Sequence, residues 1–142
     1  MNRTKQIQGQ VDRALDAARE QSWFTAEAHF LKALAASRSR NDWEGMIEIV
    51  EGVRQCRQAI RRKALVRGSV RICDDGVVET MELSPGRYLV QPPLVGADAR
   101  RLIQHGRDRG VPIAVLCREP TTKTGLIPIV AIAPGTTVRV QI

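Results

Sequence analysis

The residues that come closest to catalytic chemistry are Cys117 and His105, a thiol and an imidazole in the second half of the chain. A cysteine becomes a nucleophile when a neighbouring base or cation lowers its pKa, and histidine is a common base. Cys117, however, ends the apolar run VPIAVLC, where a small buried hydrophobic residue is expected. His29 lies on an apolar helical segment, where a hydrogen-bonded interface histidine is expected. We therefore predict no catalytic residues and a protein that is not an enzyme.

Metal and cofactor chemistry is also poorly represented. The cysteines are odd in number, widely spaced and without a CxxC or CxxH pair, so reduced and buried thiols are expected at Cys56, Cys73 and Cys117. The carboxylates at Asp74, Asp75, Glu79 and Glu82 have the spacing of turn and strand positions. Neither GxGxxG nor GxxxxGKT, the glycine-rich phosphate loops, occurs. We predict no metal and no cofactor.

The sharpest charge feature is the segment from Gly52 to Cys73, which contains no acidic residue. Its basic residues are Arg54, Arg57, Arg61, Arg62, Lys63, Arg67 and Arg71. On a helix, Arg54, Arg57 and Arg61 share one ridge, along which a nucleic acid or an acidic protein could bind. The alternative is a solvated helix end, where cations favour the negative pole of the helix and Arg57 pairs with a carboxylate. No aromatic residue lies among these arginines, which argues against a single-strand binder that stacks bases.

A second candidate site lies at the ends of two expected strands. The order strand, helix, strand from Arg87 to Cys117 predicts a parallel crossover, and ligands of such units bind beyond the carboxyl ends of the strands. There the exposed amides of a helix start could hold an anion or nucleotide, together with the candidate ligand-binding residues Gln91, Gly96, Arg118 and Lys123. Asp98 near the helix start would repel an anion, so a plain polar loop is the alternative.

Size and charge set wider limits. The chain has 142 residues, 43% of them hydrophobic, enough for one compact domain or two small ones. The net charge of +7 attracts acidic partners, but the halves share it, with 12 basic and 8 acidic residues in 1–66 and 10 and 7 in 67–142. The polar start MNRTKQIQGQ and the short apolar runs predict a cytoplasmic location and no membrane partner. The oligomeric state stays open.

The apolar spacing changes at Gly68. Before it, no proline occurs and apolar residues recur at helical spacing, whereas all 7 prolines and most β-branched pairs follow it. We therefore predict an α+β fold. Its expected parts are a module of about three helices over residues 1–66 and a small mixed β-sheet domain with one crossover helix over residues 67–142.

Three helices are expected in the first module. The first is capped by Thr4 and closes near Gln21 and Ser22, the second covers residues 25–36, and the third begins at a capping box of Asn41 and Glu44. The third helix carries one apolar stripe, interrupted by Gly52 at a cost of about 1 kcal/mol relative to alanine. This stripe consists of Met46, Ile49, Val50, Val53, Cys56, Ile60 and Ala64. The expected packing anchors are Trp23, Phe24, Phe30 and Trp43.

The second module is expected to open with an antiparallel meander. Residues 69–73 alternate, Asp75 and Gly76 form a hairpin turn, residues 77–81 return, and residues 87–91 form a third strand. A helix over 97–109 then ends at Gly110. The run from Val111 to Cys117 reads as a strand buried on both faces, and residues 126–133 and 136–142 form a C-terminal hairpin around Pro134 and Gly135.

The segment AEAHFLKAL, from Ala26 to Leu34, resembles the second helix of a tetratricopeptide repeat, with a small residue, an aromatic and an alanine at spacings of four and three. The segment WEGMI, from Trp43, resembles the opening of the next repeat. The resemblance implies a protein-binding surface within residues 7–66, and with fewer than three repeats the array needs a cap. A generic helical hairpin is the alternative, since Arg13 and Ala14 occupy the positions of the family's Leu-Gly pair.

These observations favour a non-enzymatic interaction or adaptor protein. The candidate partner-binding residues are Trp23, Phe24, Trp43, Arg54, Arg57, Arg61 and Arg62. Two alternatives remain: a nucleic-acid-binding accessory protein that uses the basic third helix, and a binder of small anions or nucleotides at the loops 91–98 and 118–125.

Overall fold

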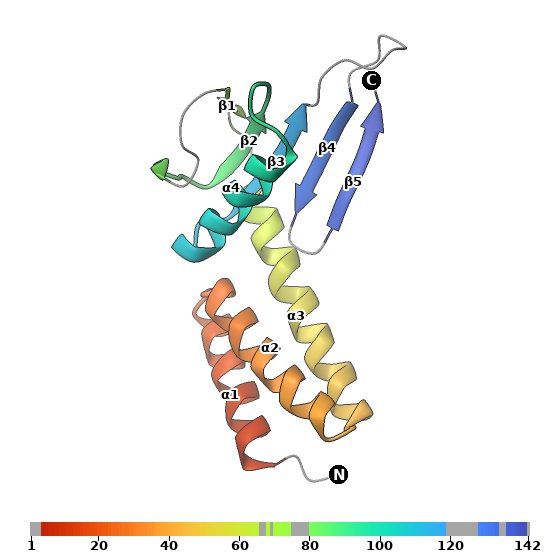
Figure 1. Cartoon of the computed structure of the whole chain (residues 1–142). Helices are drawn as coiled ribbons and strands as arrows, with labels where there is room; N and C mark the ends of the chain where they lie inside the picture. The colour runs from red at the N-terminus through yellow and green to blue at the C-terminus, as the bar shows by residue number, and fades with distance from the viewer. Residues whose placement is uncertain are drawn as a thin grey trace. The chain divides into compact units, whose positions relative to one another are not determined.

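A computed structural model of the chain contains, among the residues it describes, three consecutive helices followed by a five-stranded mixed sheet with one helix (Figure 1). The structure describes residues 4–65, 68, 70–74, 80–118, 128–133 and 136–141, and after residue 118 it describes the backbone alone. The predicted α+β fold, with its helices first, is confirmed. Two compact units divide the chain at residues 1–60 and 61–142.

Helices α1 (Lys5–Arg19) and α2 (Trp23–Ser39) form because their apolar residues recur at three- and four-residue spacing on one side. Their shared core contains Ile7, Val11 and Ala14 of α1 and Phe30 and Ala33 of α2. The N-cap of α1 is Thr4, as predicted, but its hydroxyl makes no capping hydrogen bond. Helix α2 is longer at both ends than the predicted 25–36: it also includes Trp23 and Phe24 at its start and residues 37–39 at its end.

Helix α3 (Trp43–Ala64) begins one residue later than predicted, because its cap is not Asn41 but the next residue. The cap is Asp42, whose Oδ1 accepts the Gly45 N–H at 3.0 Å. The prediction of a capping box at Asn41 is wrong, because Asn41 has a φ of +54° in the tight connection between α2 and α3. Asparagine tolerates this left-handed conformation better than most residues, so Asn41 makes the turn and Asp42 makes the cap.

One face of α3 packs into the core of the helical unit through Ile49, Val53 and Cys56. A Cβ at Gly52 would lie 2.6 Å from Cζ of Phe30, so the ring is in close contact with the α3 backbone. The prediction that Trp43 is a packing anchor is wrong, since 64% of this residue is exposed. Tryptophan begins α3 on the side that faces away from the core formed with α1 and α2.

The sheet forms in the order β1-β2-β3-β4-β5. Strands β1, β2 and β3 are parallel, whereas β4 is antiparallel to both β3 and β5. Helix α4 (Gly96–Arg109) connects β2 to β3 as the predicted crossover, and β4 and β5 form the predicted C-terminal hairpin. The strands are β1 (Val70–Cys73), β2 (Gly86–Val90), β3 (Ile113–Arg118), β4 (Pro128–Ala133) and β5 (Thr136–Gln141).

The predicted antiparallel meander is wrong. Strand β1 pairs in parallel with β2, with Val70 opposite Arg87 and Cys73 opposite Val90. A parallel pair needs a connection of about a dozen residues, which the segment between the two strands supplies. Residues 75–79, which include the predicted turn and most of the return strand, lie outside the described residues. Alternating apolar residues predict a strand but not its neighbour in the sheet, so this error is one of pairing.

Helix α4 covers one face of the sheet with Ala99, Leu102 and Ile103, against buried residues of β1, β2 and β3. A Cβ at Gly106 would lie 2.9 Å from Ile113, so this glycine permits the close approach of helix to strand. As predicted, α4 ends at Gly110, with a φ of +66°.

The opposite face of the sheet is more open. Burial alternates along β3, and Leu116 is 37% exposed, so the prediction that this run is buried on both faces is wrong. Ile72 of β1 is 58% exposed and lies in register with Leu89, which is in register with Leu116. Strands β1, β2 and β3 therefore have a buried face against α4 and an opposite face on which apolar residues are exposed.

Candidate protein-docking surface

Helix α3 carries a second apolar stripe on its outer side. Trp43, Ile47 and Val50 follow one another at spacings of four and three residues, which places them on one side of a helix. Their exposed fractions are 64%, 72% and 49%. The core residues Ile49 and Val53 lie on another side of the same helix. Helix α3 is therefore apolar on two sides, of which one is buried and one is open.

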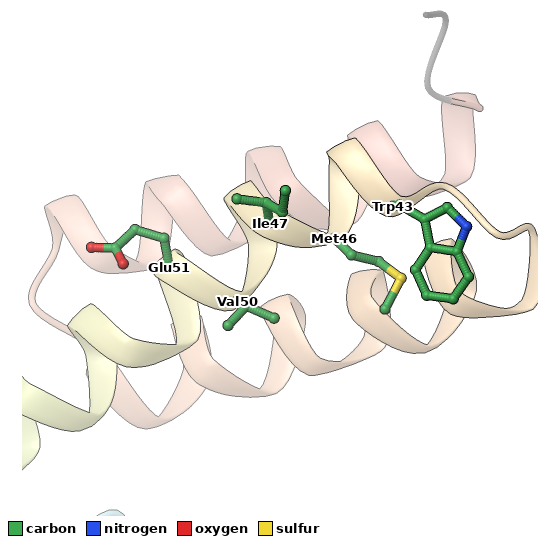
Figure 2. A pocket seen from close by; sticks show the side chains of 5 residues that line it. All are labelled: Trp43, Met46, Ile47, Val50 and Glu51. Carbon is green, nitrogen blue, oxygen red and sulfur yellow. The ribbon is translucent and has the colours of Figure 1, made fainter.

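Two adjoining cavities extend this stripe into a groove. One, of about 650 Å³, lies over α3, and Figure 2 shows the side chains that line it: Trp43, Met46, Ile47, Val50 and Glu51. The other, of about 520 Å³, lies between α2 and α3 and is lined by Leu31, Leu34, Ala35, Arg38, Ser39, Met46 and Val50. Met46 and Val50 belong to both. We call the apolar residues of the two cavities the α2–α3 surface: Leu31, Leu34, Ala35, Trp43, Met46, Ile47 and Val50.

The two sides of the α2–α3 surface differ in charge. Beside the outer stripe of α3 run Glu44, Glu48 and Glu51, all exposed and again spaced by four and three residues. Hydrogen bonds from Arg54, at 2.8 Å and 2.6 Å, and from Gln55 lower the pKa of Glu51 to about 2, so this carboxylate stays ionised. On the α2 side the groove is lined by Arg38. Glu51 is already paired with Arg54, so the acidic character of the α3 flank comes from Glu44 and Glu48, in a chain whose net charge is positive.

The arginine ridge predicted from the sequence is largely occupied by carboxylates. Arg54 pairs with Glu51, and Arg57 Nε donates to Glu27 Oε2 at 3.1 Å. Glu27 is 2% exposed, so Arg57 neutralises a buried charge, which is the structural alternative raised for it above. Arg61 is partly buried and Arg62 is exposed.

The other aromatic candidates lie elsewhere. Trp23 packs against the core of the helical unit, and Phe24 is half-buried. Neither lines the two cavities, so Trp43 is the one aromatic candidate that the structure places on the α2–α3 surface among the described residues. Sequence reasoning missed Ile47 and Leu31 and assigned Val50 to the inner stripe. The spacing of Trp43, Ile47 and Val50 was the available signal.

The predicted anion site is only partly assembled. Gln91 follows β2, Gly96 begins α4, and Arg118 ends β3, so all three lie toward the carboxyl ends of the parallel strands. The helix start, however, already holds a carboxylate: Asp98 Oδ2 accepts the Val95 N–H at 2.8 Å. Asp98 also pairs with Arg101 at 3.1 Å. Lys123 lies outside the described residues.

The thiol and imidazole candidates have structural surroundings. His105 Nε2 lies 2.8 Å from the carbonyl oxygen of Met81, and Cys117 is buried. Burial, with a smaller contribution from Glu27, raises the pKa of Cys56 to about 11, and burial also raises the pKa of Cys73. Protonated thiols are poor nucleophiles and poor metal ligands. Within the described residues no group of three or more His, Cys, Asp or Glu side chains could hold a metal ion.

Comparisons of the chain with protein-family models, curated proteins and solved structures found no match. Among the described helices, none has both the length and the apolar character needed to cross a membrane.

Proposed function

We propose that this chain is a non-enzymatic interaction or adaptor protein that binds another protein on the α2–α3 surface. The observation that carries the proposal is the exposure of Trp43, Ile47 and Val50 side by side on α3, next to a groove lined by apolar residues of α2. Single exposed apolar residues are ordinary on a protein surface, whereas a contiguous patch that contains a tryptophan is typical of binding sites.

The size of the patch fits this role. Taking about 150–250 Å² for each large apolar side chain, the exposed fractions of Trp43, Ile47, Val50 and Leu31 amount to roughly 330–550 Å². The largest apolar patch on a typical monomer is about 300–600 Å² and is often functional. Its burial would release on the order of 10 kcal/mol before the costs of association, so a specific complex is energetically accessible.

The charges of α3 do not favour the nucleic-acid alternative. A polyanion site needs a row of cations that can meet phosphates, and the ridge offers Arg54 and Arg57 already bound to carboxylates.

The proposal is tested with a photo-crosslinking amino acid placed at Ile47 of the full chain in its native cells. The matched control carries the same group at Leu15, which is 42% exposed on α1 and lies outside the α2–α3 surface. We expect a discrete crosslinked protein from position 47 that is absent from position 15, identified by mass spectrometry. Identical products from both positions, or none from either, would refute the proposal.

A further inference from the structure

Resting on the proposed function, we propose that the α2–α3 surface binds an amphipathic helix of a partner protein. This helix carries an apolar stripe and, along one flank, lysine or arginine residues that meet Glu44 and Glu48.

The shape of the surface fits a helix. The outer stripe of α3 has a spacing of four and three residues, which is the spacing at which a facing helix presents its own apolar side chains. Leu31 and Leu34 of α2 form the second wall, so the occupant lies along a groove between two helices. Amphipathic helices bind such grooves through residues at i, i+3 or i+4, and i+7.

The charges beside the groove determine which flank of the partner helix lies above α3. Glu44, Glu48 and Glu51 form a row beside the stripe, in the place where helices that pack side by side exchange salt bridges. Arg38 lines the other side of the groove. Charge complementarity therefore favours basic side chains on the flank of the partner helix that lies above α3. Carboxylates fit on its other flank, which lies above α2.

A second copy of the chain fits this surface less well. In a two-fold antiparallel pairing of two α3 helices, each flank meets the same flank of the other copy, so the acidic flanks that carry Glu44 and Glu48 would face each other. Like charges in that position are destabilising.

The probes are two synthetic helical peptides with the same leucine stripe, one with lysine and one with glutamate along a single flank. Binding to the full chain is measured by fluorescence anisotropy of the labelled peptide. Because the chain has a net charge of +7, nonspecific attraction favours the glutamate peptide. We expect the opposite, with the lysine peptide binding about tenfold more tightly.

Two variants locate this preference. The variant Glu44→Lys/Glu48→Lys should reverse the preference, whereas Asp12→Lys/Glu20→Lys, which makes the same change in net charge on exposed positions of the α1 segment, should preserve it. Removing the apolar contact by Ile47→Ser should weaken the binding of the lysine peptide by about ten- to a hundredfold. Leu15→Ser is the control. Circular dichroism establishes that each variant is folded.

Equal binding of the two peptides, or a preference that the reversal of Glu44 and Glu48 leaves unchanged, would overturn the inference. If the chain sediments as a dimer and the Ile47→Ser variant sediments as a monomer, the occupant of the α2–α3 surface is a second copy of the chain and not a partner helix. The proposed function fails separately, through the crosslinking experiment at Ile47. A discrete crosslinked protein together with no peptide preference would therefore reject the basic helix while keeping the docking surface.

Discussion

Replacing Gly52 by alanine tests the packing of α3 against α2. From helix propensity alone, a glycine inside an exposed helix costs about 1 kcal/mol relative to alanine, so Gly52→Ala should stabilise the chain. The structure predicts the reverse. The new Cβ would lie 2.6, 2.7 and 2.9 Å from three atoms of the Phe30 ring, distances that carbon atoms do not adopt without a shift.

The magnitude follows from the room available to that ring. Phe30 is 5% exposed and packs in the core with Ala26, Ala33 and Val53, so it has little space for a retreat. Overpacking a well-filled core costs about 1–3 kcal/mol, and contact with three ring atoms places Gly52→Ala toward the upper end. After subtracting the gain in helix propensity, we expect the free energy of unfolding to fall by about 1–2 kcal/mol.

Both tryptophans, Trp23 and Trp43, lie in the helical unit, so urea unfolding followed by their fluorescence reports on that unit. The matched control is Gly9→Ala in α1, where an added Cβ would have nothing within 4 Å. That variant should gain about 0.5–1 kcal/mol. Combining Gly52→Ala with Phe30→Leu, which shortens the opposing side chain, should recover part of the loss as a favourable coupling of about 1 kcal/mol.

If Gly52→Ala were as stable as Gly9→Ala, the contact between α3 and Phe30 would not exist as described. The inner and outer sides of α3 would then be wrongly assigned. An absence of coupling between Gly52→Ala and Phe30→Leu would lead to the same conclusion.

Three further predictions concern the charged and sulfur-containing side chains. Arg57→Ala removes this partner from the buried carboxylate of Glu27 and should lower the free energy of unfolding, measured in urea, by about 2–4 kcal/mol. Arg54→Ala removes one member of an exposed pair and should change the free energy of unfolding by less than about 0.5 kcal/mol. In the same Arg54→Ala variant the pKa of Glu51, followed by the NMR shift of its carboxyl carbon, should rise toward its ordinary value. Because the folded pKa is depressed, the stabilisation from this pair exists above about pH 4.5 and is lost as the pH falls below it, and it is small because the pair is exposed to solvent. The pKa of Cys56 is raised from 9.0 to about 11, so the stabilisation from keeping this thiol protonated is complete below about pH 9 and is lost as the pH rises toward 11. The free energy of unfolding should therefore fall less at alkaline pH in Cys56→Ala than in the unmodified chain. An equal fall in both would contradict this assignment.

The parts of the fold that local sequence decides were predictable. Helical spacing identified the three N-terminal helices, and the order strand, helix, strand identified the crossover through α4. The left-handed stop at Gly110 also followed from residue type. Pairing was not predictable in the same way, because the partner of β1 is chosen by contacts distant in sequence. The pairing of Arg57 with Glu27 likewise joins two helices, so the sequence showed a basic ridge where the structure has a buried ion pair.

The rotation of α3 about its axis decides which stripe becomes a binding surface, and apolar spacing leaves this rotation open. The side that turns toward α1 and α2 contains Gly52, whose missing side chain gives the Phe30 ring a place to pack, together with the core residues Ile49, Val53 and Cys56. Once that side is inside, Trp43 and Ile47 must lie outside, because they sit on another side of the helix. The close contact at Gly52 and the exposure of the outer stripe are thus two consequences of one rotation. A loss of stability in Gly52→Ala and a loss of peptide binding in Ile47→Ser should therefore be observed together, since both depend on the same orientation of α3.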